Sequence, residues 1–309
     1  MPNQLPLKWK LIVQLKRAID VIIGPPAVGL LKVLRRADLD RSADRAGRLL
    51  RRIGPLLPAH RVGRANLAAA FPEKSRAEID QILLGVWDNL GRAAAEFAHL
   101  DRLWDYDPTG RRPARVTDSD EDRARFYRLR DSGQSALIFT AHLGNWELPA
   151  VAAAGHGLTM AVVYRAPNVG GIAEAVRTLR TRQMGPLIPT GPDAPIRAAA
   201  ALERGTPVAM LVDQHSFRGA NVEIFGRRCI ANPMIARLAR HFECPIHGAR
   251  TIRQPGHRFR IEFTEPIEPP RASDGRIDVQ GTMQLITSII EGWVREYPEQ
   301  WLWLHRRWR

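Results

Sequence analysis

Residues 135–155, with the sequence SALIFTAHLGNWELPAVAAAG, hold the histidine and the carboxylate that are best spaced for proton transfer. An apolar run ends at Ala141, so His142 follows the carboxyl end of a predicted strand, where open α/β sheets bind their ligands. Glu147 comes five residues later, in the first turn of a predicted helix. If the turn brings this carboxylate back to one imidazole nitrogen, the other nitrogen can accept a proton from a hydroxyl group. On spacing alone a structural role is equally open, with Glu147 as an acid at a helix N-terminus and His142 as a turn residue.

The turn that joins these two residues has a sequence suited to a sharp change of direction. Gly144 allows a tight turn, and Asn145 is a good cap for a helix that we expect to begin at Trp146. The pattern therefore predicts a strand, a tight turn and a helix that together position His142 and Glu147.

From residue 105 onward, short apolar runs alternate with helical patterns, which is typical of an α/β sheet covered by helices. We expect strands at 136–140, 160–164, 187–189, 208–212, 245–252 and 258–263, and helices at 146–154, 172–184, 194–204, 233–242 and 280–297. Residues 41–103 keep a helical pattern, broken at Gly54-Pro55 and Phe71-Pro72. We therefore predict an α/β fold with a mixed central sheet flanked by helices at 105–309, and a helical section of the same domain at 37–104. The order of the strands does not follow from these patterns.

Three blocks of the chain, in the same order, resemble a known enzyme family. The block HLGNWE, from His142 to Glu147, is similar to the H-x4-(D/E) motif of the glycerolipid acyltransferase superfamily, and its final Glu resembles the lipid A late-acyltransferase branch. That branch also has a D-Q pair followed by F-F-G, similar to Asp213-Gln214 and residues 222–226, and it ends in a block similar to PEQWLWLHRRW at 298–308. The likeness runs from about Asp80 to the C-terminus. Where many relatives have a Thr-Gly pair after F-F-G, this chain has Ala231-Asn232-Pro233, which leaves the acyl-chain length and the acceptor open.

The resemblance implies a reaction and a role for the matched residues. A fatty acyl group would pass from an acyl thioester, usually on acyl carrier protein, to a hydroxyl of a lipid A precursor. His142 would take the hydroxyl proton, and Glu147 would orient the imidazole and balance its charge. We expect no covalent intermediate, metal or cofactor, and neither Cys229 nor Cys244 stands in a nucleophile motif.

Four further residues are assigned to the substrate site. Arg165 follows the strand expected at 160–164 and is the candidate for stabilising an oxyanion or holding an anionic headgroup. Asp213 also follows a strand, and the family places an acid there. Both have structural alternatives, Arg165 as a surface arginine and Asp213 as an acid that bonds a loop backbone or Arg165. Asn145 and Gly226, within the matched blocks, complete the set.

The charge of the chain is concentrated near its start. The net charge is +14, and residues 1–76 contain sixteen Lys or Arg against five Asp or Glu. An anionic partner is therefore expected. Nucleic acid is disfavoured because no zinc-finger, RNP-like or basic-zipper pattern is present, and because the basic residues alternate with apolar clusters. A membrane surface accounts for both features.

Residues 1–36 form the predicted membrane contact. Apolar residues recur there at helical spacing beside lysines and arginines, and the longest uncharged run, 21–31, is broken by Pro25 and Pro26. Since a spanning helix needs about 20 apolar residues, we predict an interfacial anchor held by apolar burial and by anionic lipid. Combined with the family resemblance, which implies the cytoplasmic face of the inner membrane, this predicts a peripheral or monotopic protein there. The alternative is a helix pair that packs on the domain with a solvated basic face.

Other functions remain open at this point. The same dyad could acylate another membrane glycolipid or a lysophospholipid. A basic peripheral membrane-binding protein that has lost catalysis is the non-enzyme alternative, although intact His142 and Glu147 count against it.

Overall fold

The computed structural model describes residues 25–26, 28–106, 114–166 and 170–308. The anchor expected at 1–36 therefore lies mostly outside the described residues, and of its end, residues 28–36 are helical. None of the helices within the described ranges is long and apolar enough to cross a membrane.

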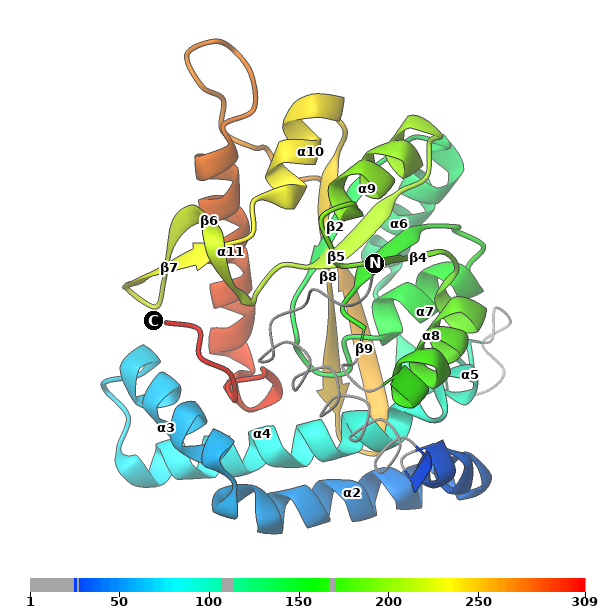
Figure 1. Cartoon of the computed structure of the whole chain (residues 1–309), viewed down its shortest axis with the longest axis vertical. Coiled ribbons are helices and arrows are strands. Elements are labelled where there is room, and N and C mark those ends of the chain that lie inside the picture. The colour runs from blue at the N-terminus through cyan, green and yellow to red at the C-terminus, as the bar shows by residue number, and fades with distance from the viewer. Residues whose placement is uncertain (1–24, 27, 107–113, 167–169, 309) are drawn as a thin grey trace, which may run out of the picture.

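Helices α2 (Leu39–Ile53), α3 (Pro58–Ala70), α4 (Arg76–Phe97) and α5 (Leu100–Leu103) make up the predicted helical section. Ser75 starts α4 with a capping box, in which its hydroxyl accepts from the backbone N–H of Glu78 while the Glu78 carboxylate accepts from the backbone N–H of Ser75. The two predicted breaks are confirmed, because η2 (Gly54–Leu56) separates α2 from α3, and α3 ends before Phe71. Helices α2 and α4 pack against each other at the lower end of the molecule in Figure 1.

Seven strands form the central sheet, in the order β1-β9-β8-β2-β5-β3-β4. All neighbouring strands are parallel except β8 and β9, so the predicted mixed sheet is confirmed as a mostly parallel one. Six strands match the expected segments, and only the two-residue β1 was not anticipated. Their bounds are β1 (Val116–Thr117), β2 (Leu137–Thr140), β3 (Ala161–Tyr164), β4 (Leu187–Pro189), β5 (Val208–Leu211), β8 (Ile246–Gln254) and β9 (Arg258–Phe263).

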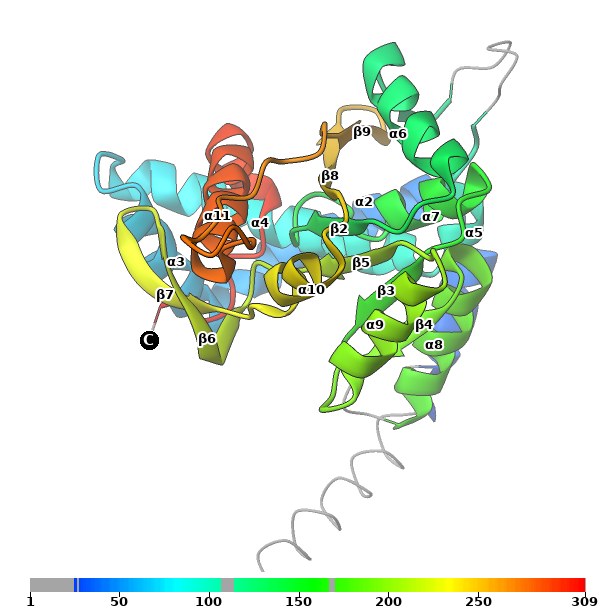
Figure 2. The same cartoon turned by 90° about the horizontal axis from the view of Figure 1, so that it is seen from above.

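Helices flank this sheet on both sides, as Figures 1 and 2 show. The five predicted helices are present with ends shifted by at most two residues, and α6 is additional. Their bounds are α6 (Asp120–Ser132), α7 (Leu148–Gly155), α8 (Gly170–Met184), α9 (Ala194–Glu203), α10 (Met234–Phe242) and α11 (Val279–Glu296).

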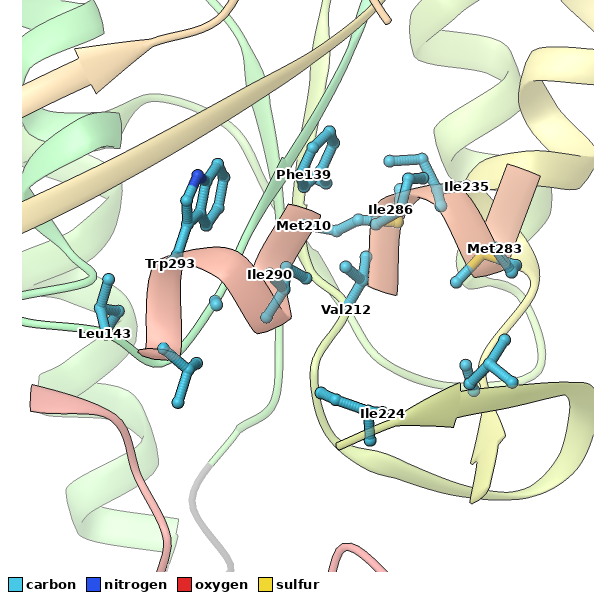
Figure 3. Packing of buried hydrophobic residues seen from close by; sticks show 14 of the residues in the cluster. Phe139, Leu143, Met210, Val212, Ile224, Ile235, Met283, Ile286, Ile290 and Trp293 are labelled. Atoms are coloured by element: carbon cyan, nitrogen blue, oxygen red, sulfur yellow. The ribbon is translucent and has the colours of Figure 1, made fainter. Parts of the chain in front are cut away.

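Successive side chains of the central strands point into two different hydrophobic cores. Leu137 and Phe139 of β2 belong to one core, whereas Ile138 between them belongs to the other, because successive side chains of a strand point to opposite faces. Helix α11 covers the first face with residues spaced three or four apart, a stripe that faces the sheet. Figure 3 shows this stripe near Phe139 and Met210; its members are Met283, Ile286, Ile290 and Trp293.

The strands β6 (His215–Ile224) and β7 (Arg227–Ala231) form a separate antiparallel hairpin that the sequence patterns did not predict. Phe225 and Gly226 make its two-residue turn, with φ values of 54° and 68°, as hairpin turns of this length require. The hairpin packs on α11 and is not part of the seven-stranded sheet.

Candidate active site

The register of the sheet brings His142 and Asp213 together. Strand β5 pairs in parallel with β2, and Thr140 lies opposite Leu211 at the end of both strands. Two residues beyond this pair, at the carboxyl edge, His142 and Asp213 face each other. The imidazole Nδ1 is 2.8 Å from Asp213 Oδ1, and the backbone N–H of His142 donates to Asp213 Oδ2 at 2.9 Å.

Asp213 is completely buried but well supplied with donors. Burial disfavours its charged form, yet the charge of His142, the two hydrogen bonds from His142 and one from the Trp301 indole N–H hold the pKa of Asp213 well below its ordinary value. The carboxylate therefore stays ionised at neutral pH. An ionised Asp213 can only accept, so Nδ1 is the donor in this hydrogen bond and carries a proton.

The other ring nitrogen faces the side of the site where a substrate can lie. Gln214 is 3.3 Å from His142 Nε2 through its side-chain amide nitrogen, and both residues line the same cavity. With the proton on Nδ1, Nε2 carries a lone pair and accepts from this amide. If a substrate hydroxyl group took the place of the Gln214 amide beside Nε2, it would donate to the same lone pair. This is the arrangement that a general base needs.

The position of Glu147 corrects the geometry expected from the sequence. Its carboxylate does not bond the imidazole; it forms a bidentate ion pair with Arg180 of α8, through Arg180 Nε at 2.9 Å and through Nη2. Both side chains are largely buried, at 10% and 16% exposure for Glu147 and Arg180. The guanidinium also lies 5.4 Å from the ring centre of Phe97 and 5.6 Å from that of Tyr164. The motif acid thus ties the start of α7 to α8, while the acid from β5 partners the histidine.

Asn145 likewise differs from its expected role as the cap of a helix starting at Trp146. Helix α7 begins at Leu148, and Asn145 Oδ1 accepts from the backbone N–H of Glu147 at 3.2 Å in a local turn. Its Nδ2 donates to the buried carboxylate of Glu96 on α4 at 2.8 Å. Asn145 therefore fixes the turn, and its side chain also lines the cavity.

The remaining two predicted residues are placed differently. Arg165 directly follows β3, is exposed and lines the cavity, and within the described ranges no carboxylate lies within 4.0 Å of its guanidinium. Gly226 lies in the β6–β7 turn and is not among the residues that line the cavity. Next to it, Phe225 packs on Phe71 and Trp303, so this part of the motif docks the hairpin onto the C-terminal block.

The C-terminal block holds the histidine turn from behind. The backbone N–H of Leu302 donates to the His142 carbonyl at 3.1 Å, and the Gly144 N–H donates to the Gln300 carbonyl at 3.0 Å. Between these bonds, Trp301 is 1% exposed and donates to Asp213 at 2.7 Å. The third sequence block thus supports both members of the His142–Asp213 pair.

A cavity of about 950 Å³ adjoins these groups, on the sheet face covered by α7. Its polar groups near the carboxyl edge include His142, Gln214 and the Glu147–Arg180 pair. Most of the wall beyond them is apolar and comes from α4, α6, α7, α8 and the sheet, including Ala93, Phe97, Phe126, Leu129, Ile138, Ala150, Ala153, Met160, Val162 and Met184. A cavity of this size and apolar lining is suited to a largely hydrocarbon ligand, and His142 lies in its wall.

Metal ligands and thiols are the other reactive groups to consider among the residues that the structure describes. No group of three His, Cys, Asp or Glu in the described residues is placed to hold a metal ion. Burial raises the pKa of the Cys229 thiol and raises that of Cys244 to about 11, so neither forms much thiolate at neutral pH.

Arg180 and the role of Trp301 were missed by sequence reasoning. Arg180 lies in the polar stretch RTLRTRQM beside Arg177 and Arg182, and nothing in that pattern distinguishes the one that faces Glu147. The Trp301 indole finds its acceptor 88 residues earlier in the chain. Only the fold brings these groups together.

Comparison with known protein families gives a match over most of the chain. The model of the family described as bacterial lipid A biosynthesis acyltransferase matches residues 17–309, nearly the whole chain. The comparison with curated proteins finds no match. The match covers the histidine turn, Asp213 and the C-terminal block, and it confirms the resemblance inferred from the three sequence blocks.

Proposed function

We propose, since this chain belongs to the bacterial lipid A biosynthesis acyltransferases, that it transfers a fatty acyl group from acyl carrier protein to a hydroxyl of a lipid A precursor. The observation that carries the proposal is the hydrogen bond between His142 Nδ1 and Asp213, with the opposite face of the imidazole in the wall of a mainly apolar cavity.

The step needs one base and no covalent intermediate. His142 Nε2 takes the proton of the acceptor hydroxyl while its oxygen attacks the thioester carbonyl, forming the new C–O bond. The carbon–sulfur bond then breaks, and the proton on His142 passes to the departing thiolate. Asp213 keeps Nδ1–H in place and stabilises the imidazolium that forms in between. Asp213 thus takes the role that the sequence suggested for Glu147.

The cations of the cavity have different tasks. Arg165 and Arg180 are the Lys or Arg residues that line it in the described part of the chain. Arg180 is neutralised by Glu147, so we assign to this pair the shape and rigidity of the cavity wall. Arg165 is exposed at the carboxyl edge without a carboxylate partner in the described ranges, and so its charge is available for an anionic headgroup or for the oxyanion.

A membrane surface is the proposed setting of the reaction. Exposed arginines recur along one face of α2, at Arg41, Arg45, Arg48 and Arg52, and apolar Leu49 and Ile53 lie exposed beside them. This mixture supports contact with anionic lipid at the inner membrane, in addition to the segment 1–36. Deleting residues 1–36 should weaken binding to anionic vesicles, and the remaining binding should fall with added salt.

The test of the proposal is acyl transfer by purified full-length protein. Acyl carrier protein and coenzyme A, each carrying a labelled acyl group, are offered separately as donors. Each donor is tested with a lipid A precursor and with a lysophospholipid as acceptor. Folded His142→Ala protein serves as the control. We expect transfer from acyl carrier protein to the lipid A precursor and loss of transfer in the control. Transfer mainly to lysophospholipid would favour the alternative acceptor. Vesicle binding without any transfer would favour the non-enzyme alternative.

A further inference from the structure

A buried polar network lies behind the histidine turn, on the side away from the main cavity. Arg253, at the end of β8, forms a two-pronged ion pair with Glu96 of α4, at 2.5 Å through Nη1 and 2.8 Å through Nη2. The two side chains are 12% and 2% exposed. Neither residue lines the cavity that contains His142, so neither can touch a substrate there.

The network reaches the turn through two amide side chains. The Glu96 carboxylate also accepts from Asn145 Nδ2, and Asn145 Oδ1 in turn accepts from the Glu147 N–H. The third guanidinium donor, Arg253 Nε, bonds Asn89 Oδ1 at 2.8 Å, and Asn89 Nδ2 donates to the Gly144 carbonyl at 3.1 Å. One guanidinium thereby holds the turn at Gly144 and at Asn145.

The same arginine is also tied to the C-terminal block. Its backbone N–H donates to Gln300 Oε1 at 2.7 Å, and its carbonyl accepts from Gln300 Nε2 at 3.0 Å. The Gln300 carbonyl accepts from the Gly144 N–H and from Asn89. Three segments far apart in sequence, α4, the end of β8 and residues around 300, therefore meet at the two residues that follow Leu143.

We propose that the Glu96–Arg253 ion pair is a positioning device that acts through Asn145 and Asn89 to fix the turn carrying His142. This inferred role rests on the proposed function, because the orientation of the turn affects the reaction only if His142 is the base. A buried pair of this kind gives little net stability by itself, since the cost of removing both charges from water offsets their attraction. The three fixed donor directions of the guanidinium supply orientation, which a lysine cannot reproduce.

The experiment compares Arg253→Lys with Arg250→Lys. Arg250 is a matched control on the same strand, 8% exposed and paired with Glu262 and Glu296, with no hydrogen bond to the turn among the described residues. We expect Arg253→Lys to lower kcat by about 10- to 100-fold with KM unchanged, the effect of misplacing a reacting group by about 1 Å. The control should keep its kcat within about twofold of wild type, because its ion pairs do not reach the turn and their loss should not move His142.

A second measurement does not depend on activity. In protein labelled at the histidine ring nitrogens, the His142 resonances, assigned by comparison with His142→Gln, should shift in Arg253→Lys and stay in place in Arg250→Lys. Glu96→Gln provides a second variant, which keeps the side-chain shape if Arg253→Lys fails to fold. Unchanged His142 resonances in a folded Arg253→Lys or Glu96→Gln protein would overturn the inference, whereas absence of transfer in the wild type would overturn only the proposed function.

Discussion

Asp213 and Glu147 are two buried acids of the same site, and their partners are the reverse of what their positions in the sequence suggest. Glu147 is five residues from His142 but pairs with Arg180, which comes 33 residues later. Asp213 is 71 residues from His142 and bonds it twice. The difference follows from the sheet, because parallel pairing of β2 with β5 sets their ends side by side, whereas the turn after His142 carries Glu147 toward α8.

The two pairs also differ in what they can do. The Asp213 carboxylate receives three donors on its two oxygens and holds the Nδ1 side of the imidazole, an arrangement that favours proton transfer at Nε2. Glu147 instead accepts from the guanidinium of Arg180 on both of its oxygens, so its carboxylate is engaged by α8 and does not reach the imidazole. Topology therefore separates a pair that can do chemistry from one that shapes the site.

The largest effect should come from removing His142, the proposed base. His142→Ala is expected to lower the rate of acyl transfer by about 10² to 10⁴-fold, the usual contribution of a general base. The measurement is single-turnover transfer from acyl carrier protein, with circular dichroism to verify folding. A folded variant that retains more than about a tenth of the wild-type rate would contradict the assignment of His142 as the base.

Asp213→Asn should come next, with a loss of about 10² to 10³-fold. The oxygen of asparagine would accept from the His142 N–H and Trp301, and its NH₂ would then face Nδ1. The imidazole would have to move its proton to Nε2, where a base needs a lone pair. Nitrogen resonances of the His142 ring report the tautomer directly, and an unchanged tautomer with a normal rate would remove Asp213 from the mechanism.

Glu147→Gln should cost less, about 10- to 100-fold, because it loosens the wall of the site and leaves the His142–Asp213 bond in place. The pH dependence of kcat/KM should keep its wild-type shape. Combined with Arg180→Met, it should show little further loss, since both changes break one ion pair. If Glu147→Gln instead matched Asp213→Asn in rate and tautomer, proximity in the sequence would be the better guide to the dyad.

The sequence predicted most helices and strands of this fold well, but it did not predict which strands lie side by side in the sheet. Strand and helix positions followed from apolar periodicity and from glycine and proline, which act locally. His142 and Asp213 were both expected at carboxyl ends of strands, so the missing information was only that β5 lies beside β2. The hairpin β6–β7 was missed because much of one side of β6 is solvated and its pattern is polar. Gly226 was assigned to substrate on family likeness, although its positive φ gives it a structural task in the hairpin turn.

A smaller effect should distinguish Trp301, which bonds Asp213, from its neighbour Trp303, which does not. Trp301→Phe removes a hydrogen bond to a buried carboxylate and should lower the free energy of unfolding by about 2 kcal/mol, with a several-fold fall in rate. Trp303→Phe is the matched control, because Trp303 is equally buried but donates to the neutral carbonyl of Pro298. We expect about 1 kcal/mol from the control and no change in rate. The measurements are denaturant unfolding and acyl transfer for both variants. Equal changes in the two variants would show that the hydrogen bond from the Trp301 indole to Asp213 does not affect the reaction.

The smallest effect concerns pH and stability. Burial lowers the pKa of His60, His99, His156, His247 and His305, so these side chains stay neutral in the fold at pH values where the unfolded chain binds protons. Stability should therefore fall as pH drops below about 6.5, the ordinary histidine value. Asp213 acts in the same sense but at lower pH, since its lowered pKa adds stability that is present above the ordinary aspartate value of about 4 and is lost as the pH falls below it.

The interval between pH 7.5 and 5.5 thus isolates the histidines from the acid. We expect Tm to fall by at least about 2 °C across it, equivalent to roughly 1 kcal/mol in a protein of this size. His247→Asn should reduce that fall, because asparagine does not titrate and can still donate to the Thr264 carbonyl that now lies 3.0 Å from His247 Nδ1. Asp213→Asn should lower stability by a similar amount at both ends of this interval, because Asp213 is ionised throughout it, and should therefore leave the fall in Tm unchanged. A Tm that is flat from pH 7.5 to 5.5 would mean that the buried histidines gain protons as easily in the fold as in the unfolded chain.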